Sequence, residues 1–274
     1  MKTPRYFTLT LLIFVTFAFV PNSFAQERER PMVKIIYFYP NDVTPQPDID
    51  TKLDTLSKDV QQVYAGLMEV HGFGRKTFPL EENTTGNTLV HQIQGRFNNT
   101  YYENDAGKVW DEIRETFDLN KDVYLIFLDI SSGLLNGFAC GFGSYQLNSA
   151  IIPASGQCFE GDLGVDVTAH ELGHGLGLAH DHRGNADANR IYLHTNDTMI
   201  TSYCAAEWLD AHPAFNTSST TRNRNTEMEI LEPKLESSPN NIRFRFEVSD
   251  PDGLHQAYSY RKVMETYCCA VVKH

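Results

Sequence analysis

The sequence predicts an α/β (α+β) protein with a mixed twisted sheet, followed by a short β-rich tail. Three observations carry this prediction. Strand-like apolar runs alternate with amphipathic helical stretches up to residue 153, a histidine-rich helical stretch follows at residues 170–181, and alternating strand-like segments return only after residue 226.

The chain begins with a strand, a helix and two further strands. The first predicted strand is Val33–Tyr39, which is β-branched and aromatic. Asp48–Val70 follows as an amphipathic helix, because its apolar residues recur at spacings of three and four. Lys76–Leu80 and Thr88–Gln94 are predicted as two strands on either side of a turn at 83–87.

A second helix and a central strand come next. Ala106–Phe117 is predicted to be helical with its apolar residues on one face, and Asp122–Ile130 is apolar enough to be a central strand. Ser131–Ser149 is rich in glycine and serine, and the short apolar piece Ala150–Pro153 precedes the histidine-rich stretch. Cys204–Ala211 is predicted as a closing helix.

The histidine-rich stretch has the spacing of a zinc site. His170 and His174 lie four residues apart and therefore share one face of a helix, with Glu171 beside them. Gly177 can adopt the left-handed conformation that ends a helix, which lets His180 reach the same point. Three imidazoles suit a catalytic Zn²⁺, whose fourth position holds a water with a pKa lowered to about 7. Glu171 is then the general base for amide hydrolysis.

The length of the pattern makes it specific. A five-residue HExxH occurs by chance in many sequences, and a lone histidine on an apolar helix face is more often packed or solvated than a ligand. Here three histidines, one glutamate and one glycine are fixed within residues 170–180. This pattern resembles the H-E-x-x-H-x-x-G-x-x-H signature of the metzincin metalloproteases. The resemblance implies a metzincin-like catalytic domain with an active-site helix, a small C-terminal subdomain and one zinc ion.

Three more residues resemble metzincin features that support the site. Met199, within Thr198–Tyr203, is similar to the methionine turn that runs beneath the zinc in this family; the alternative is an ordinary core methionine. Tyr203 resembles the tyrosine that follows this methionine in astacins and serralysins, but it comes four residues after the methionine instead of two. Asp181 resembles the adamalysin branch, where an aspartate follows the third histidine. The two cues point to different branches, so no subfamily is assigned.

The resemblance also implies how substrate binds. In metzincins an edge strand above the zinc lies antiparallel to the bound peptide, which docks by adding a strand. That edge strand is expected within Gly141–Ile152, although its glycines equally suit a mobile loop.

The N-terminus predicts export. Lys2 and Arg5 precede a largely apolar run over Phe7–Val20, and Ser23–Ala25 has the small residues of a signal-peptide cleavage site. We therefore expect a secreted, extracellular protein whose mature chain starts at Gln26; an uncleaved N-terminal anchor is the alternative. No later stretch reaches the roughly 18 apolar residues that a membrane span needs. The net charge of −12 argues against nucleic acid as a partner.

The predicted domain organisation has four parts. Residues 1–25 are the signal peptide, 26–215 the metzincin-like protease domain, 216–226 a linker, and 227–274 a β-rich tail. In the tail, Glu227–Leu231 and Asn241–Val248 alternate like strands of an immunoglobulin-like β-sandwich, which needs about 100 residues. The tail is therefore either part of a truncated β-sandwich domain or a segment that docks on the catalytic domain.

The cysteines and one polar stretch predict further structural features. Five cysteines in an exported chain predict disulfides with one cysteine left over. Cys140 with Cys158 is the favoured pair, and Cys158 with Cys204 is its competitor; Cys268 and Cys269 are unassigned. The polar stretch 181–190 is a solvated loop or a calcium loop, and its spacing matches no known calcium motif, so a Ca²⁺ site lacks support.

The sequence as a whole predicts a secreted zinc-dependent endopeptidase that acts on peptides or proteins. His170, His174 and His180 are the expected ligands, Glu171 the base, and Met199, Tyr203 and Asp181 the supporting residues. Two alternatives stay open: a catalytically inactive metzincin-like binding domain, and a surface or adhesion protein whose function lies in the tail. Substrate preference and oligomeric state are not predicted.

Overall fold

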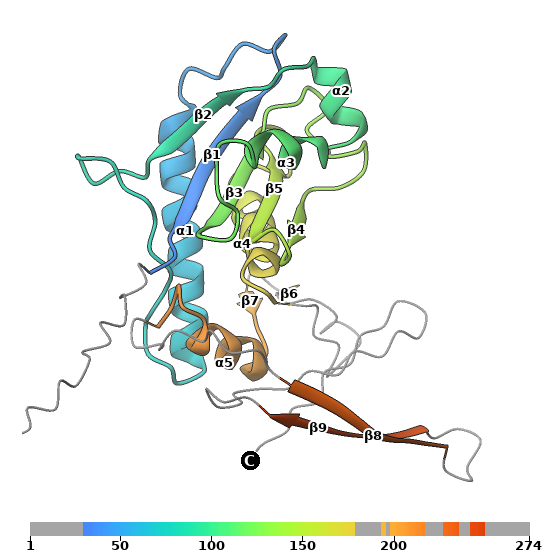
Figure 1. Ribbon diagram of the computed structural model, residues 1–274. Coiled ribbons are helices and arrows are strands. Elements are labelled where there is room, and N and C mark those ends of the chain that lie inside the picture. Colours follow the sequence, from blue (N-terminus) through green and yellow to red (C-terminus); the bar gives the residue numbers. More distant parts are fainter. Residues whose placement is uncertain (1–29, 179–192, 196–197, 217–226, 236–241, 250–274) are drawn as a thin grey trace, which may run out of the picture.

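The computed structural model describes residues 30–178, 193–195, 198–216, 227–235 and 242–249 (Figure 1). The predicted signal peptide, His180, Asp181, the polar stretch 181–190 and residues 217–226 of the linker therefore lie outside the described residues. None of the described helices is both long and apolar enough to cross a membrane.

A five-stranded sheet of order β2-β1-β3-β5-β4 forms the centre of the fold (Figure 1). The strands are β1 (Val33–Tyr39), β2 (Val90–Gln94), β3 (Val123–Leu128), β4 (Phe142–Ser144) and β5 (Ser149–Pro153). Four strands run parallel, and β4 pairs antiparallel with β5 at one edge. The predicted mixed α/β fold class is confirmed.

Helices cover both faces of this sheet. α1 (Ile49–Val70) and α4 (Gly161–Gly175) pack on one face, and the short α2 (Asn99–Asn104) and α3 (Lys108–Ile113) lie on the other (Figure 1). Because both faces are covered, every residue of β3 is buried. Alternate residues of β1 enter opposite cores, with Ile35 on the α1 side and Ile36 on the α3 side.

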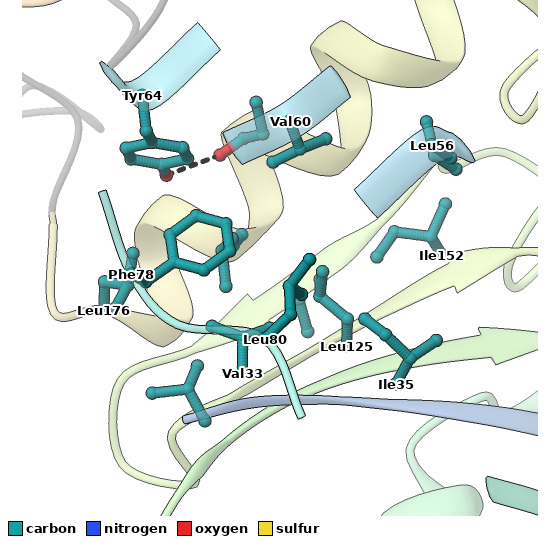
Figure 2. Close-up of a cluster of buried hydrophobic side chains, with 14 of the residues drawn as sticks. Val33, Ile35, Leu56, Val60, Tyr64, Phe78, Leu80, Leu125, Ile152 and Leu176 are labelled. Atoms are coloured by element: carbon teal, nitrogen blue, oxygen red, sulfur yellow. Dashed lines mark hydrogen bonds between the residues drawn. The ribbon is translucent and has the colours of Figure 1, made fainter. Parts of the chain in front are cut away.

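The larger core fastens the histidine-rich helix to the sheet. Leu172 and Leu176, from the end of α4, lie in one cluster with residues of α1, of the sheet and of the 78–80 segment (Figure 2). Within it, the buried Tyr64 hydroxyl of α1 donates a hydrogen bond of 2.8 Å to the backbone oxygen of Ala169 on α4. A buried donor and acceptor pair of this kind fixes how the two helices lie against each other.

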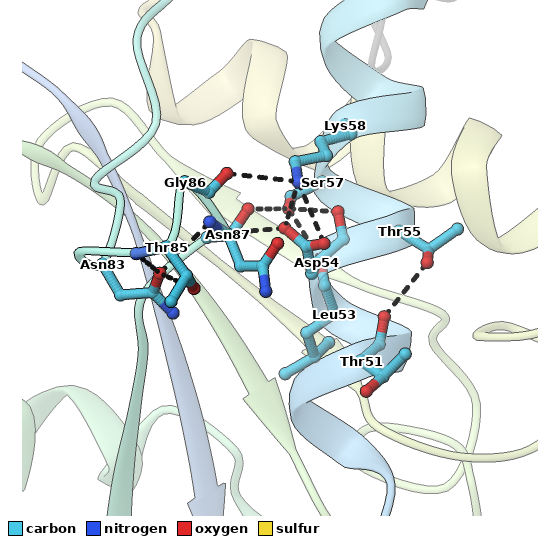
Figure 3. Close-up of polar contacts among 11 residues, drawn as sticks. Thr51, Leu53, Asp54, Thr55, Ser57, Lys58, Asn83, Thr85, Gly86 and Asn87 are labelled. Atoms are coloured by element: carbon cyan, nitrogen blue, oxygen red, sulfur yellow. Dashed lines mark hydrogen bonds and ion pairs between the residues drawn. The ribbon is translucent and has the colours of Figure 1, made fainter.

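The turn at 83–87 is present and is tied to α1 (Figure 3). The Asn83 side-chain oxygen accepts hydrogen bonds from the Thr85 and Asn87 backbone N–H groups. Asp54 of α1 forms an ion pair with Lys58 and accepts a 2.7 Å hydrogen bond from the backbone of Thr88.

The prediction of a strand at Lys76–Leu80 was wrong. Only Leu80 forms an isolated bridge, with Val33, and the carbonyl of Pro79 accepts from the Val33 N–H. Pro79 has no N–H to offer a ladder, so the apolar side chains enter the core from an irregular segment. The strand predicted at Thr88–Gln94 is confirmed from Val90 onward as β2, which pairs parallel with β1.

The predicted helix Ala106–Phe117 is shorter in the structure and follows a helix that was not predicted. α3 covers Lys108–Ile113, and the chain then continues in tighter turns, with the Thr116 N–H donating to the Ile113 carbonyl. Asn98 caps the N-terminus of α2, because its side chain accepts a hydrogen bond from the Tyr101 N–H.

The remaining elements follow α4. β6 (Leu193–Thr195) and β7 (Thr198–Ile200) form a two-stranded antiparallel ladder, and α5 (Tyr203–Ala211) closes the predicted protease domain. The Arg30 guanidinium donates to the carbonyls of Ala214 and Thr77, which joins the first described residues to the segment after α5. In the tail, β8 (Glu227–Leu235) and β9 (Ile242–Ser249) pair antiparallel at the two predicted positions. The domain boundaries themselves stay predictions.

Candidate active site

α4 places the first two histidines of the motif side by side. The ring centroids of His170 and His174 lie 4.9 Å apart with perpendicular planes. The intervening Leu172 is fully buried in the core, so the helix is anchored on that side while the two imidazoles share another side. The spacing predicted this juxtaposition.

The tautomer of His174 is set by the backbone. Its Nδ1 lies 2.8 Å from the carbonyl oxygen of Leu178, and because a carbonyl can only accept, Nδ1 carries the proton. Nε2 is then the unprotonated nitrogen, which carries the lone pair of the ring. Burial lowers the pKa of His174, which favours the neutral ring. A neutral imidazole whose other nitrogen donates to a backbone carbonyl is the usual arrangement of a metal-ligating histidine.

A glycine ends the helix as the motif predicts. Gly177 has φ +89, and the Leu178 N–H donates to the carbonyl of Gly173 at 2.8 Å. This 6→1 bond across a left-handed residue is the Schellman arrangement, which reverses the chain direction. The Trp208 indole of α5 packs against the turn and donates to the Leu176 carbonyl. Residues 179–192, which include His180, lie outside the described residues.

The side chain of Glu171 extends from α4 toward the edge-strand segment. Burial raises the pKa of its carboxyl group to about 7, and a hydrogen bond from the Gly143 backbone opposes this rise. A Cβ atom placed on Gly141 or Gly143 would come within 2.4 Å of Glu171 or His174. β4 therefore runs directly against the part of α4 that carries the motif.

The segment before β4 is linked covalently to the segment before α4. Cys140 and Cys158 form a disulfide with their Cα atoms 5.2 Å apart. The favoured pairing of Cys140 with Cys158 is confirmed, and the competing pairing of Cys158 with Cys204 is wrong.

The supporting residues are placed in part. Met199 lies in β7, opposite His194 of β6. Tyr203 is the first residue of α5, is 48% exposed, and packs its ring against Phe73 at 5.5 Å and His71 at 6.1 Å between centroids. The family roles of both residues stay predictions.

The described part of the site suits zinc. Among the residues that the structure describes, no group of three or more metal-ligating side chains occurs, and the predicted third ligand His180 falls outside them. The two described donors are imidazoles on one helix, and the backbone fixes the tautomer of His174. Such a donor set is the kind that zinc takes in catalytic sites.

Sequence reasoning missed the two glycines that face the motif. Gly141 and Gly143 stood out only as part of a glycine-rich stretch in which an edge strand was expected. Gly141 directly precedes β4 and Gly143 lies within it, and residues two apart in an extended chain face the same side, so the G-x-G spacing was the available signal.

No protein-family model matches the chain, and no curated protein sequence matches it. The chain does match solved structures. The catalytically inactive OgpA from Akkermansia muciniphila, in complex with an O-glycopeptide (glycodrosocin) substrate, superposes with a TM-score of 0.60 at 18% identity, over 85% of this chain and 75% of that chain. The chain has the fold of OgpA.

Wild-type OgpA gives the same result in two crystal forms. One matches with a TM-score of 0.62 at 19% identity, over 95% of this chain and 83% of OgpA. The other matches with a TM-score of 0.60 at 19% identity, over 87% and 76%. At this level of identity the similarity to OgpA shows architecture alone, and that architecture has the mixed α/β character that the sequence predicted.

Proposed function

We propose that this protein is a secreted zinc-dependent endopeptidase. The observation that carries the proposal is that α4 presents three groups: two neighbouring imidazoles, at His170 and His174, and the partly buried carboxyl group of Glu171, which lies against the edge-strand segment. OgpA, whose fold this chain shares, was crystallised with an O-glycopeptide substrate, which supports a peptide as the ligand class.

His170, His174 and the predicted His180 would hold the metal. Zinc, when bound, polarises the scissile carbonyl and lowers the pKa of water. Leu178 contributes by accepting a hydrogen bond from His174 Nδ1, since this bond orients the ring and leaves Nε2 as the unprotonated nitrogen that would coordinate the metal.

Glu171 performs the proton transfers in this proposal. It takes a proton from the attacking water and returns it to the nitrogen of the leaving amine as the C–N bond breaks. A carboxyl group whose pKa burial has raised to about 7 is matched to a proton that moves both ways near neutral pH. When zinc is bound, its positive charge is a further influence on the pKa of this carboxyl group.

The edge strand β4 would align the substrate. β4 pairs with β5 on one side only in the five-stranded sheet, and it lies against the helix that carries Glu171. An extended peptide that adds to its open side satisfies backbone hydrogen bonds and brings a peptide bond to Glu171. Backbone pairing of this kind makes few demands on substrate side chains.

The test is cleavage of a denatured mixture of proteins by purified residues 26–274, beside Glu171→Ala, with zinc measured in both. Loss of a general base costs about 10²- to 10⁴-fold in rate. We expect wild type to cleave and the variant to bind one zinc without cleaving. Zinc binding with no cleavage by either protein would overturn the endopeptidase proposal in favour of a binding domain.

The same preparation can be given one peptide with and without an O-linked glycan. Faster cleavage of the glycopeptide would show that this protein shares a preference for O-glycopeptides with OgpA. Equal rates would show that the two proteins share a fold without sharing that preference.

A further inference from the structure

The approach of β4 to α4 depends on two residues without side chains. At Gly141, a Cβ atom would lie 2.4 Å from Cγ of Glu171, 2.8 Å from its Cδ and 3.0 Å from Oε1. The space that a side chain at position 141 would need is thus filled by the carboxyl group of the proposed base.

Gly143 makes a different close approach. Its Cβ would lie 2.4 Å from Cβ of His174 and 2.5 Å from the backbone oxygen of Glu171, so it would meet the body of α4 itself. With no Cβ in the way, the backbone N–H of Gly143 donates a hydrogen bond to the Glu171 side chain.

Backbone conformation is not the reason for these glycines. Gly141 and Gly143 are absent from the described glycines with positive φ, so an alanine at either site would meet atoms without meeting backbone strain. A covalent bond also restrains this segment, because the neighbouring Cys140 is joined by the disulfide to Cys158, just before α4 begins. A bulkier strand therefore has limited freedom to retreat from the helix.

We propose that Gly141 and Gly143 are positioning residues that together place the carboxylate of Glu171 for proton transfer. Gly141 leaves the room in which the carboxyl group lies, and Gly143 holds it there through its N–H. The inference rests on the proposed function of Glu171 as the base, and it adds the part of the chain that orients this base.

Gly141→Ala is the sharper test, because the three heavy atoms nearest to the added methyl all belong to the flexible Glu171 side chain. We expect kcat to fall by about 10²-fold, the size of effect that a displacement of about 1 Å produces, with KM, Tm and zinc content unchanged. Gly66→Ala, in open space on α1, is the matched control that should keep full kcat. A Gly141→Ala enzyme with wild-type kcat, or one that loses Tm and kcat together, would overturn the proposal.

A second measurement does not depend on activity. In zinc-loaded protein labelled with ¹⁵N-glycine, the Gly143 amide should exchange with solvent at least about tenfold faster in Glu171→Ala than in wild type, because its acceptor is gone. Gly66, which lies on α1, serves as the reference amide. Equal exchange in both proteins would contradict the hydrogen bond.

This second result also separates two failures. If wild type cleaves nothing but the Gly143 amide responds to Glu171, then the proposed function is wrong and the placement of the carboxylate by β4 stands. If wild type cleaves and the amide does not respond, the placement is wrong and the function stands.

Discussion

The indole N–H of Trp208 donates a hydrogen bond of 2.9 Å to the backbone carbonyl of Leu176. Leu176 follows the last residue of α4, where helix carbonyls have no partner within the helix, and Trp208 lies on α5, more than thirty residues later in the chain. The closing helix therefore fastens the turn that follows the histidine motif, and the free energy of that contact can be measured.

Trp208→Phe should lower stability by about 1 kcal/mol beyond the effect of reduced ring size, since it leaves a carbonyl without its donor. Trp110→Phe is the matched control, because the Trp110 indole N–H has no hydrogen-bond partner in the described structure. Urea unfolding of both variants gives the comparison. Equal losses of stability would show that the Trp208 bond contributes nothing.

Gly177→Ala should destabilise the protein through two separate effects. The residue has φ +89, which costs an L-residue about 1 to 2 kcal/mol, and its Cβ would lie 3.0 Å from the Trp208 ring. Gly72→Ala isolates the first effect, because Gly72 has φ +83 and nothing within 4 Å of its Cβ. We expect a larger loss of unfolding free energy at Gly177. A loss no larger than that at Gly72 would show that the Trp208 ring moves aside freely.

Acid should destabilise the protein in part through His212. Burial lowers the pKa of this histidine to about 4, and its Nδ1 accepts a hydrogen bond from the Ala214 N–H, so the folded state holds the neutral ring. The unfolded chain takes up a proton near pH 6.5. The neutral His212 therefore makes its full contribution to stability above pH 6.5. This contribution falls as the pH drops toward 4, by about 3 kcal/mol at most.

His212→Asn keeps an acceptor near the position of Nδ1 and removes the titration. Chemical denaturation at pH 7.5, 6 and 5 should show a shallower pH dependence for the variant than for wild type. Parallel curves for the two proteins would contradict the assignment of this pH dependence to His212.

The sequence predicted best those parts of the fold whose pattern is long and regular. β1 has the predicted bounds, α1 lacks only Asp48, which precedes its first turn, and the buried β3 lies within the predicted Asp122–Ile130. Their apolar periodicity is decided by burial on one or both faces, and burial is what the pattern records.

Errors fell where tertiary contacts override local pattern. Lys76–Leu80 alternates like a strand, but Pro79 interrupts its hydrogen-bonding edge. α2 has only six residues, which is too few to show a helical periodicity. The helix-capping residue Asn98 was the only sequence signal for it. At the site, the motif predicted that His170 and His174 are neighbours. The contribution of Gly141 and Gly143 depends on how closely two distant segments approach, and that distance is not encoded in either segment alone.

Zinc titration against cleavage tests the central claim most directly. Purified protein is stripped of metal with a chelator, zinc is returned in steps, and bound zinc and the rate of cleavage of a denatured protein mixture are measured on the same samples. The account predicts that stripping abolishes cleavage and that the rate rises in proportion to bound zinc until one ion per chain, while Glu171→Ala binds the same ion and stays inactive. Cleavage that survives removal of the metal, or that persists in Glu171→Ala, would contradict it.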